Sequence, residues 1–299
     1  FQIPRIRFSM RACTKSCKFC GTSMRGVAED FHPMRGLILN APVDHAMNNS
    51  VLHSAISVGV VCPDEHNQKF AQFISGLNRQ SQAKHNTDYL ISFPGFYRAF
   101  KTGLDLPDPT SSKWKQITAS SERDVHKAAV EFGDSIIRKI DQLSANSSDV
   151  ILIYIPEEYE VFTSYTDGTI NYDLHDYIKA YAAQKQVATQ FVREKTIESD
   201  LHCQIMWALS LALYVKSGRT PWVVNGIQPD TAFAGIGYSV MNGPSGSNVV
   251  VGCSHIYSSD GRGMKYKLSK IQDYSFDRKK NPYLSEEEAY RIGLNIKEL

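Results

Sequence analysis

The chain has 299 residues, of which 42% are hydrophobic and 21% are charged, and its formal net charge is +2. This composition is typical of folded globular proteins, so it excludes wholesale disorder, and the near-neutral charge excludes the strongly basic class of nucleic-acid-binding proteins. No apolar run approaches the roughly 20 residues that a membrane span needs, so we expect no direct membrane insertion. The length favours two domains over one.

The first 52 residues have the composition of irregular chain. Pro33, Gly36 and Pro42 follow one another at short intervals, and Asn48 and Asn49 come next. Such residues favour turns and interrupt helices and strands. We therefore expect an irregular N-terminal segment over residues 1–52.

This segment contains three of the six cysteines, Cys13, Cys17 and Cys20, in a C-x3-C-x2-C spacing. The spacing resembles the cluster-binding loop of radical SAM enzymes, in which three thiolates hold an iron–sulfur cluster. A zinc site would need a fourth ligand, for which His32 is the nearest candidate. The fold of radical SAM enzymes needs strand–helix repeats after this loop, and the following residues lack them. We therefore favour the interpretation that the three cysteines are incidental. A structural metal site and a redox cluster stay open as alternatives.

The other three cysteines lie in apolar patterns that predict buried positions. Cys62 and Cys253 fall in strand patterns and Cys203 falls in a helix pattern. Free buried cysteines of this kind suit a reducing compartment, so the expected location is the cytoplasm.

From His53 onward, apolar strands alternate with helices, and we predict a Rossmann-like α/β domain over residues 53–220. The runs Ser54–Cys62 and Val150–Ile155 are continuous enough to be buried parallel strands. Apolar residues recur at helical spacing over Glu122–Leu143. The other expected elements are helices from Pro63 to Leu77, Asp173–Lys185 and Ser199–Ser217, and strands at Val187–Val192 and from Pro221.

Residues 221–299 show a different pattern, with consecutive strands at Thr231–Met241, Asn248–Tyr257 and Met264–Ser269 and a helix at Ser285–Leu299. Glycine-rich turns join the strands, which predicts an antiparallel meander. The start of an RNase H-like sheet has this order. Because that fold needs further strands, we expect this part to be incomplete.

The segment Asp173–Trp222 carries the most informative chemistry. His175 and Lys179 are four residues apart near the start of a predicted helix, so their side chains share one face. The free N–H groups and the positive end of the helix dipole lie at the same place, and together these groups form an anion site. The alternative is that both residues are ordinary surface positions opposite the apolar residues Leu174 and Ile178.

Several motifs in this region resemble the junction of the MID and PIWI domains of prokaryotic Argonautes. The matching segments are Asp173–Ala180, Ala188–Phe191, Leu213–Trp222 and Thr231–Ser239, in the same order and at similar spacings. This resemblance implies an α/β fold in which a Rossmann-like MID domain precedes the start of an RNase H-like PIWI domain.

In that family, the MID domain holds the 5′-phosphate of a guide strand with a set of four side chains. The first stands four residues before a Lys, and a Gln on the next strand and a Lys at the end of the next long helix complete the set. Carried over to this sequence, the set is His175, Lys179, Gln190 and Lys216. No cofactor is firmly implied, although Mg²⁺ at the guide 5′-phosphate stays open.

One position departs from the pattern of Argonautes that cut their targets. Those proteins place a metal-binding Asp after Gly-Ile in the first PIWI strand, whereas this chain has Gly237 after Gly235 and Ile236. Two-metal hydrolysis needs carboxylates to hold its Mg²⁺ pair, and glycine supplies none. The resemblance therefore implies a protein without slicing activity, and we assign no catalytic or metal-binding residue.

The implied function is that of a catalytically inactive Argonaute, of the short MID–PIWI kind, in prokaryotic defence. It would hold a short 5′-phosphorylated guide, with RNA as the expected chemistry, and recognise complementary invader DNA or RNA. An effector, such as an NADase, a nuclease or a membrane protein, would deliver the output. Two alternatives are a metal-dependent guide-directed nuclease and an iron–sulfur enzyme built on Cys13, Cys17 and Cys20.

Overall fold

The computed structural model describes residues 5–9, 27–46, 54–84, 89–120, 122–168, 170–228, 231–236, 239–243, 246–258, 263–270, 273–277 and 282–297. The chain forms two compact units, Phe1–Trp222 and Val223–Leu299. From the sequence, a boundary is expected after residue 220. The identities of the two parts as guide-binding and nuclease-like domains stay predictions.

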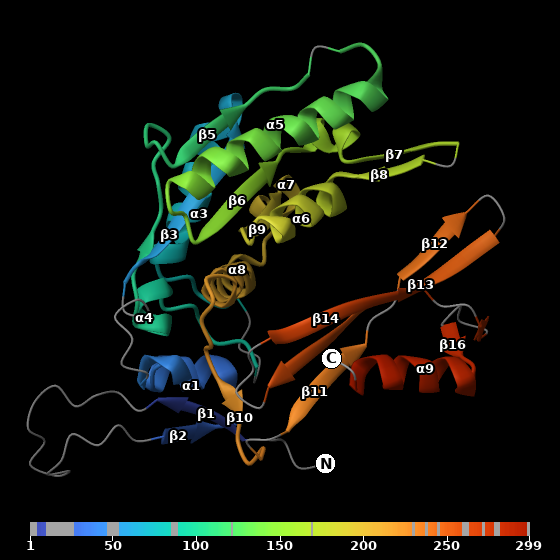
Figure 1. Ribbon diagram of the computed structural model, residues 1–299. Coiled ribbons are helices and arrows are strands. Elements are labelled where there is room, and N and C mark those ends of the chain that lie inside the picture. The colour runs from blue at the N-terminus through green and yellow to red at the C-terminus, as the bar shows by residue number, and fades with distance from the viewer. Residues whose placement is uncertain are drawn as a thin grey trace, which may run out of the picture. The chain divides into compact units, whose positions relative to one another are not determined.

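The first unit is built on a parallel sheet, which confirms the predicted α/β class (Figure 1). The central strand is β3 (Ile56–Pro63), which pairs in parallel with β6 (Val150–Ile155). β6 in turn pairs with β9 (Ala188–Arg193), and the short strands β4 (Leu104–Asp105) and β5 (Trp114–Ile117) both pair with β3. Every residue of β6 is buried, as expected of a strand covered on both faces.

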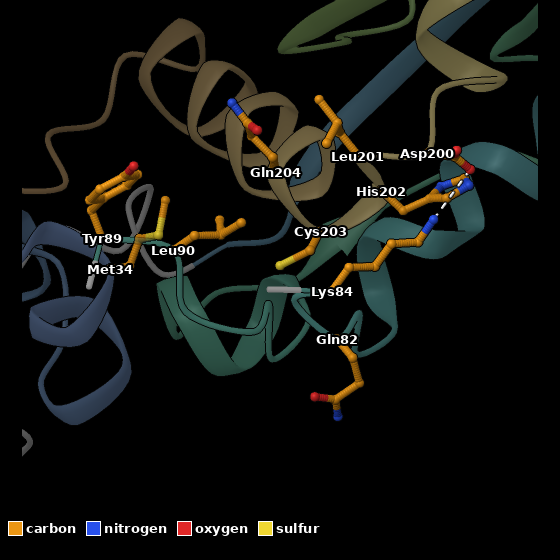
Figure 2. A pocket seen from close by; sticks show the side chains of 10 residues that line it. All are labelled: Met34, Gln82, Lys84, Tyr89, Leu90, Asp200, Leu201, His202, Cys203 and Gln204. Atoms are coloured by element: carbon orange, nitrogen blue, oxygen red, sulfur yellow. Dashed lines mark ion pairs between the residues drawn. The ribbon is translucent and has the colours of Figure 1, made fainter. Parts of the chain in front are cut away.

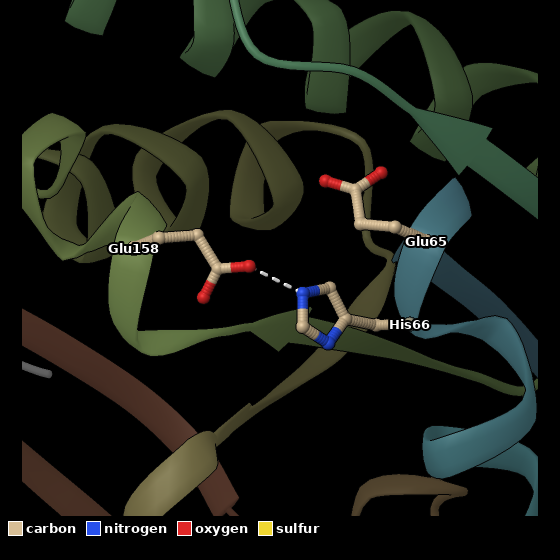
Figure 3. Close-up of side chains that lie close together, drawn as sticks. All are labelled: Glu65, His66 and Glu158. Carbon is tan, nitrogen blue, oxygen red and sulfur yellow. Dashed lines mark hydrogen bonds and ion pairs between the residues drawn. The ribbon is translucent and has the colours of Figure 1, made fainter.

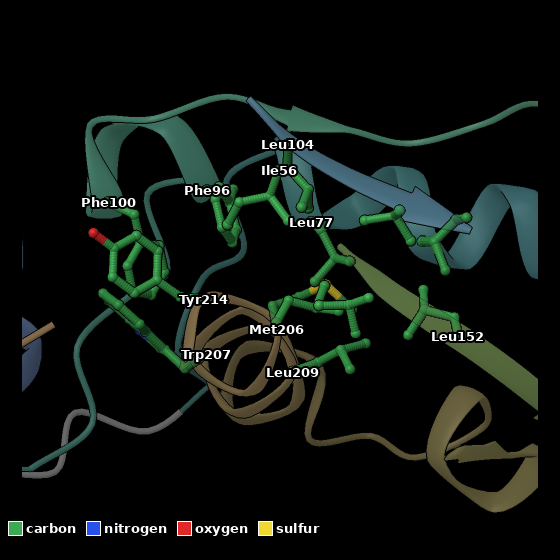
Figure 4. Close-up of a cluster of buried hydrophobic side chains, with 14 of the residues drawn as sticks. Ile56, Leu77, Phe96, Phe100, Leu104, Leu152, Met206, Trp207, Leu209 and Tyr214 are labelled. Carbon is green, nitrogen blue, oxygen red and sulfur yellow. The ribbon is translucent and has the colours of Figure 1, made fainter. Parts of the chain in front are cut away.

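Helices cover both faces of this sheet. One face packs against α5 (Val125–Ala145) and α6 (Leu174–Gln184) through residues such as Ile136 and Ile178. The other packs against α3 (Asn67–Ser75), α4 (Phe96–Phe100) and α8 (His202–Lys216). Figure 4 shows part of this second core, in which the aromatic rings of Phe100 and Tyr214 stack at 4.6 Å. Burial of this apolar surface is the main source of stability in such a layered domain.

The predicted helix boundaries agree closely with the observed ones. α5 begins after Asp124, whose carboxylate accepts hydrogen bonds from the backbone N–H groups of His126 and Lys127 at 2.9 and 3.3 Å. α6 begins after Asp173, which caps it in the same way. The first predicted helix is divided into the 3₁₀ turn η2 (Asp64–His66), α3 and the 3₁₀ turn η3 (Gly76–Asn78).

The first 52 residues contain regular structure, so the expectation of irregular chain is wrong there. They include β1 (Ile6–Ser9), β2 (Val27–Asp30), α1 (Pro33–Leu39) and the 3₁₀ turn η1 (Val43–Ala46). Pro33 occupies the first turn of α1, where its missing N–H is not needed. Gly36 lets the buried ring of Phe8 lie against the helix, since a Cβ at Gly36 would stand 2.2 Å from that ring.

The rest of the first unit consists of short connecting elements. They are η4 (Glu157–Phe162), the hairpin of β7 (Ser164–Asp167) and β8 (Ile170–Asp173), and α7 (Glu194–Ile197). η4 follows β6 directly and α7 follows β9 directly, so both lie at the carboxyl edge of the sheet. In the described part of the chain, no helix has the length and apolar character to cross a membrane.

The second unit contains the predicted antiparallel strands. β11 (Ala232–Ile236), β12 (Ser239–Gly243) and β14 (Gly263–Lys270) all pair antiparallel with the long β13 (Gly246–Ser258). The strand expected over Thr231–Met241 is thus described as two strands. A second hairpin, β15 (Tyr274–Phe276) with β16 (Pro282–Leu284), precedes the predicted C-terminal helix α9 (Glu286–Lys297).

Candidate anion-binding site

Lys179 lies on α6 and points to the neighbouring strand β9. Its ammonium donates hydrogen bonds to the carbonyl oxygen of Thr189 at 2.5 Å and to the Thr189 hydroxyl at 2.9 Å. Because Thr189 is buried, the ammonium of Lys179 lies between α6 and the edge strand β9. The register of helix and strand therefore places this positive charge away from the solvated face of α6.

Lys216 reaches the same carbonyl oxygen from another element. It is the last residue of α8, and its ammonium donates to the Thr189 carbonyl at 2.8 Å and to Oε1 of Gln190 at 2.7 Å. The amide nitrogen of Gln190 donates to the Phe191 carbonyl at 2.8 Å, which fixes the orientation of the amide. Three residues predicted from the sequence, Lys179, Gln190 and Lys216, thus converge on the first half of β9.

His175, the fourth predicted residue, stands apart from these three. Its side chain is 53% exposed, and its ring lies 5.3 Å from the ring of Phe191. Nδ1 of His175 is 3.2 Å from a carboxylate oxygen of Asp176. His175 therefore faces the carboxyl half of β9, whereas the lysines face its amino half.

The electrostatics of the lysine pair favour an anion. Burial and the neighbouring charge of Lys216 lower the pKa of Lys179 to about 8 from the usual 10.5, and burial also lowers the pKa of Lys216. Among the described residues, neither ammonium forms an ion pair with a carboxylate. Two like charges held together in a partly desolvated place are unfavourable, and a bound anion would offset both.

Two residues at this place were missed by sequence reasoning. Thr189 supplies the shared acceptor through its backbone carbonyl, for which the sequence holds no signal. Arg193, at the end of β9, lines a small hollow together with His175 and Phe191, as well as Ile155, Thr163 and Leu174. No spacing motif links Arg193 to His175, because the hollow that they share depends on how β9 and α6 pack.

A cation could also be held near the start of α6. Oxygen or nitrogen atoms of Asp173, His175 and Asp176 lie within 4.8 Å of one another, although all three residues are exposed. One oxygen of Asp173 already accepts the Asp176 backbone N–H at 3.0 Å as the helix cap. Mg²⁺ at a bound phosphate therefore stays a prediction for this end of the helix.

A larger cavity lies elsewhere in the first unit and contains none of the four predicted residues. Figure 2 shows this cavity, of about 340 Å³, at the beginning of α8, with Met34, Leu90 and Cys203 among its apolar walls. The ion pair of Lys84 with Asp200, at 3.2 Å, lies at its border. Since Lys216 is at the other end of α8, this cavity and the lysine pair are separate features.

Several residues of the sequence-based hypotheses lie outside the described parts of the chain. They are the three cysteines of the N-terminal cluster, Cys13, Cys17 and Cys20, and Gly237 at the expected position of a catalytic Asp. Cys62 and Cys203 are described, and both are free and buried as predicted.

Comparison with known proteins found similar solved structures only. No protein-family model matches the chain, and no curated protein matches it. One similar structure is Aa-Ago with externally bound siRNA, at 17% identity and a TM-score of 0.47 over 84% of this chain and 30% of that one. Another is Drosophila Piwi, at 13% identity and a TM-score of 0.47 over 90% of this chain and 30% of that one. The chain thus spans about a third of the length of these proteins, which bear the Argonaute and Piwi names.

Proposed function

We propose that the first unit of this protein binds the 5′-phosphate of a short guide strand, most simply RNA, at Lys179, Gln190 and Lys216. One observation carries the proposal: two half-buried ammonium groups contact the same Thr189 carbonyl and have no carboxylate partner in the described part of the chain. A terminal phosphate carries close to two negative charges at neutral pH, so it balances the positive charges of the lysine pair.

Hydrogen-bonding capacity also favours phosphate. A terminal phosphate offers three strong acceptor oxygens, and each lysine has three N–H donors, of which two are used within the protein. One N–H of each ammonium is therefore left for a ligand. Such charge-assisted bonds contribute roughly 1.5–3 kcal/mol each.

The chemistry beside the lysine pair suits the first nucleotide of a guide. The rings of His175 and Phe191 could stack on a base. The guanidinium of Arg193, which pairs with Glu160 at 3.6 Å and is 41% exposed, would contact the next backbone phosphate. The residue motifs over Asp173–Ser239 that resemble Argonautes give the reason for choosing a nucleic acid as the source of the phosphate. Mg²⁺ would serve here as an optional counterion held near Asp173 and Asp176.

The guide then pairs with complementary invader DNA or RNA, and the protein recognises this target without cutting it. Gly237 supports this part of the proposal, because it stands where slicing Argonautes have a metal-binding Asp. The response passes to an effector in the same defence system, an NADase, a nuclease or a membrane protein, while this protein acts in the cytoplasm.

The direct test compares RNA oligonucleotides of one sequence that carry either a 5′-phosphate or a 5′-hydroxyl. We expect at least tenfold tighter equilibrium binding of the phosphorylated strand. Lys185→Ala is the control and should keep this preference, because Lys185 is an exposed lysine directly after α6. Matching DNA strands, added as competitors, decide between RNA and DNA guides. Equal affinity for the two 5′ ends would contradict the proposal.

A second measurement concerns slicing. Protein loaded with phosphorylated guide is incubated with a labelled complementary strand and Mg²⁺ or Mn²⁺. We expect the target to be bound and to stay intact. Guide-dependent cleavage opposite a fixed guide position would overturn the assignment as inactive and favour the metal-dependent nuclease.

A further inference from the structure

A second cluster of charged side chains lies at the carboxyl edge of the parallel sheet, in a part of the first unit that the proposed phosphate site does not use. Glu65 and His66 follow β3 in the turn η2, and Glu158 follows β6 in η4. β3 and β6 are adjacent parallel strands, so the segments that follow them emerge side by side. Figure 3 shows the three side chains converging from these two segments. The crevice at the carboxyl ends of parallel strands is the usual place for ligands in α/β folds.

The donor atoms of this cluster are close enough to share one ion. One oxygen of Glu65, one of Glu158 and a ring nitrogen of His66 all lie within 4.8 Å of one another. Nε2 of His66 is 2.5 Å from Oε1 of Glu158. Ligands at about 2.0–2.2 Å from a tetrahedral Zn²⁺ stand roughly 3.5 Å apart. Shifts of about an ångström in the positions of the two exposed carboxylates would therefore complete the geometry.

Neighbouring groups hold two of these side chains in position. The Tyr159 hydroxyl donates to Oε1 of Glu65 at 2.7 Å and itself accepts the Ala119 backbone N–H at 3.1 Å. The His66 ring meets the ring of Tyr154 edge-on, with centroids 5.7 Å apart. Such outer contacts orient metal ligands and are common around protein metal sites.

The charge balance of this edge also favours a cation. Among the described residues, neither Glu65 nor Glu158 has a lysine or arginine partner. Lys69, the nearby lysine, is bound by Glu194 and Glu198, so its charge is already matched by two carboxylates. In the described part of the chain, Glu65 and Glu158 therefore lie beside the imidazole of His66, and no lysine or arginine is paired with either carboxylate.

An independent observation points to a ligand at the same place. Tyr154 is fully buried near the end of β6, and its hydroxyl has no hydrogen-bond partner in the described part of the chain. A buried hydroxyl without a partner is costly and uncommon in native proteins. The carboxylates that act on this hydroxyl are those of Glu194 and Glu158, and its ring contacts His66. A water molecule on an ion held by His66 and Glu158 would give the hydroxyl a partner.

We propose that Glu65, His66 and Glu158 bind a divalent transition ion such as Zn²⁺ or Mn²⁺. Two carboxylates and one imidazole suit these ions, whereas Mg²⁺ favours oxygen ligands and retains its water. The ion takes the place of the proton between His66 and Glu158 and ties the end of β3 to the end of β6. The proposal does not depend on phosphate binding at Lys179 and Lys216.

Mn²⁺ alone, added to the metal-free chain, is the probe that tests this site. It has little preference for thiolates, so the N-terminal cysteines do not compete. The EPR signal of the free ion reports how much remains unbound. We expect saturable binding, with affinity at least tenfold weaker in Glu158→Gln and His66→Asn. Glu157→Gln, which removes the adjacent exposed carboxylate, is the matched control and should stay within twofold of the unmodified chain.

Two further readouts sharpen the outcome. Mn²⁺ should raise the thermal unfolding midpoint of the unmodified chain and of Glu157→Gln, but not of Glu158→Gln, and tenfold excess Mg²⁺ should leave Mn²⁺ bound. If His66→Asn fails to fold, Glu158→Gln decides, because its side chain is half-exposed. No saturable binding, equal binding by Glu158→Gln and the unmodified chain, or displacement by Mg²⁺ would each overturn the proposal.

Discussion

Two charged clusters of opposite sign lie on the same parallel sheet in the first unit. The lysine pair gathers at the amino half of the edge strand β9, where Lys179 and Lys216 contact the Thr189 carbonyl. The acidic cluster gathers beyond the carboxyl ends of β3 and β6, where Glu65 and Glu158 flank His66. Among the described residues, the lysines have no carboxylate partner and the two glutamates have no lysine or arginine partner. One sheet thus carries a charged cluster of each sign, because helices and turns bring like charges together at different edges.

The two clusters also differ in burial. Lys179 and Lys216 are mostly buried, and burial lowers the pKa of both. The carboxylate of Glu158 is 52% exposed, so water screens its charge. Loss of a ligand interaction should therefore cost more at the lysine pair than at the acidic cluster.

The largest effect is expected when both lysines are removed. In Lys179→Ala combined with Lys216→Ala, the affinity for 5′-phosphorylated RNA should fall by a hundredfold or more, since each charge-assisted bond contributes roughly 1.5–3 kcal/mol. The affinity for 5′-hydroxyl RNA should change by less than threefold. Fluorescence anisotropy measures both. A similar loss for the two RNAs would show that the lysines hold the backbone in general and not the terminal phosphate.

The next effect is a dependence of phosphate binding on pH. Lys179 has a pKa of about 8 in the free protein, and bound phosphate would raise it because an anion favours the charged ammonium. Raising the pH from 7 to 9 deprotonates Lys179 in the free protein, so the affinity should fall by about tenfold. Lys179→Arg, whose guanidinium stays charged, should show a flatter profile. An unchanged affinity up to pH 9 would mean that Lys179 does not titrate in the binding step.

The third effect concerns stability without a ligand. At pH 7, Lys179→Met should raise the free energy of unfolding by about 1 kcal/mol, because it replaces a half-buried charge by an apolar chain of similar length. The folded-state pKa of Lys179 is lowered from 10.5 to about 8, so the unfolded chain holds this proton more tightly. The unmodified protein should therefore gain stability from pH 8 to about 10.5, and the advantage of the variant should shrink.

Urea unfolding at pH 7 and pH 9.5 measures both parts of this prediction. Lys185→Met is the control, because Lys185 is exposed and should show no such difference. If Lys179→Met is less stable than the unmodified protein at pH 7, then the hydrogen bonds to Thr189 outweigh the cost of the buried charge.

The smallest effect is expected at His175. Its side chain is half-exposed and, in the described structure, pairs with Asp176 and not with the lysine pair, so His175→Ala should weaken binding of phosphorylated RNA only two- to threefold. His175→Phe should keep full affinity if the ring stacks on the first base. A loss as large as that of Lys179→Ala would instead make His175 a direct phosphate ligand.

The elements around the lysine pair could be predicted from the sequence because their signals are local. Val150–Ile155 is apolar throughout, as a central parallel strand requires, and Asp173 is a capping residue directly before α6. The helix Pro33–Leu39 was missed although proline is favoured in the first turn of a helix, because Pro33 and Gly36 serve equally well as turn residues. The ring of Phe8 lies against Gly36 through tertiary packing, which leaves no local signal.

The same distinction separates the two clusters. The pairing of Lys179 with Lys216 followed from a motif resemblance, and the shared acceptor Thr189 was missed because a backbone carbonyl leaves no mark in a sequence. Glu65 and Glu158 are 93 positions apart, and neither lies in a recognisable metal-binding motif. Only the adjacency of β3 and β6 brings them together, so this cluster could not be predicted without the fold.

The most direct test of the central claim is a cycle of four affinities: the unmodified protein and Lys179→Ala, each with 5′-phosphorylated and 5′-hydroxyl RNA of one sequence. The phosphate and the lysine are coupled if the benefit of the phosphate depends on the lysine. We predict that the phosphate improves the affinity of the unmodified protein at least tenfold and that of Lys179→Ala by threefold or less. An equal benefit of the phosphate in both proteins would contradict a phosphate site at the lysine pair.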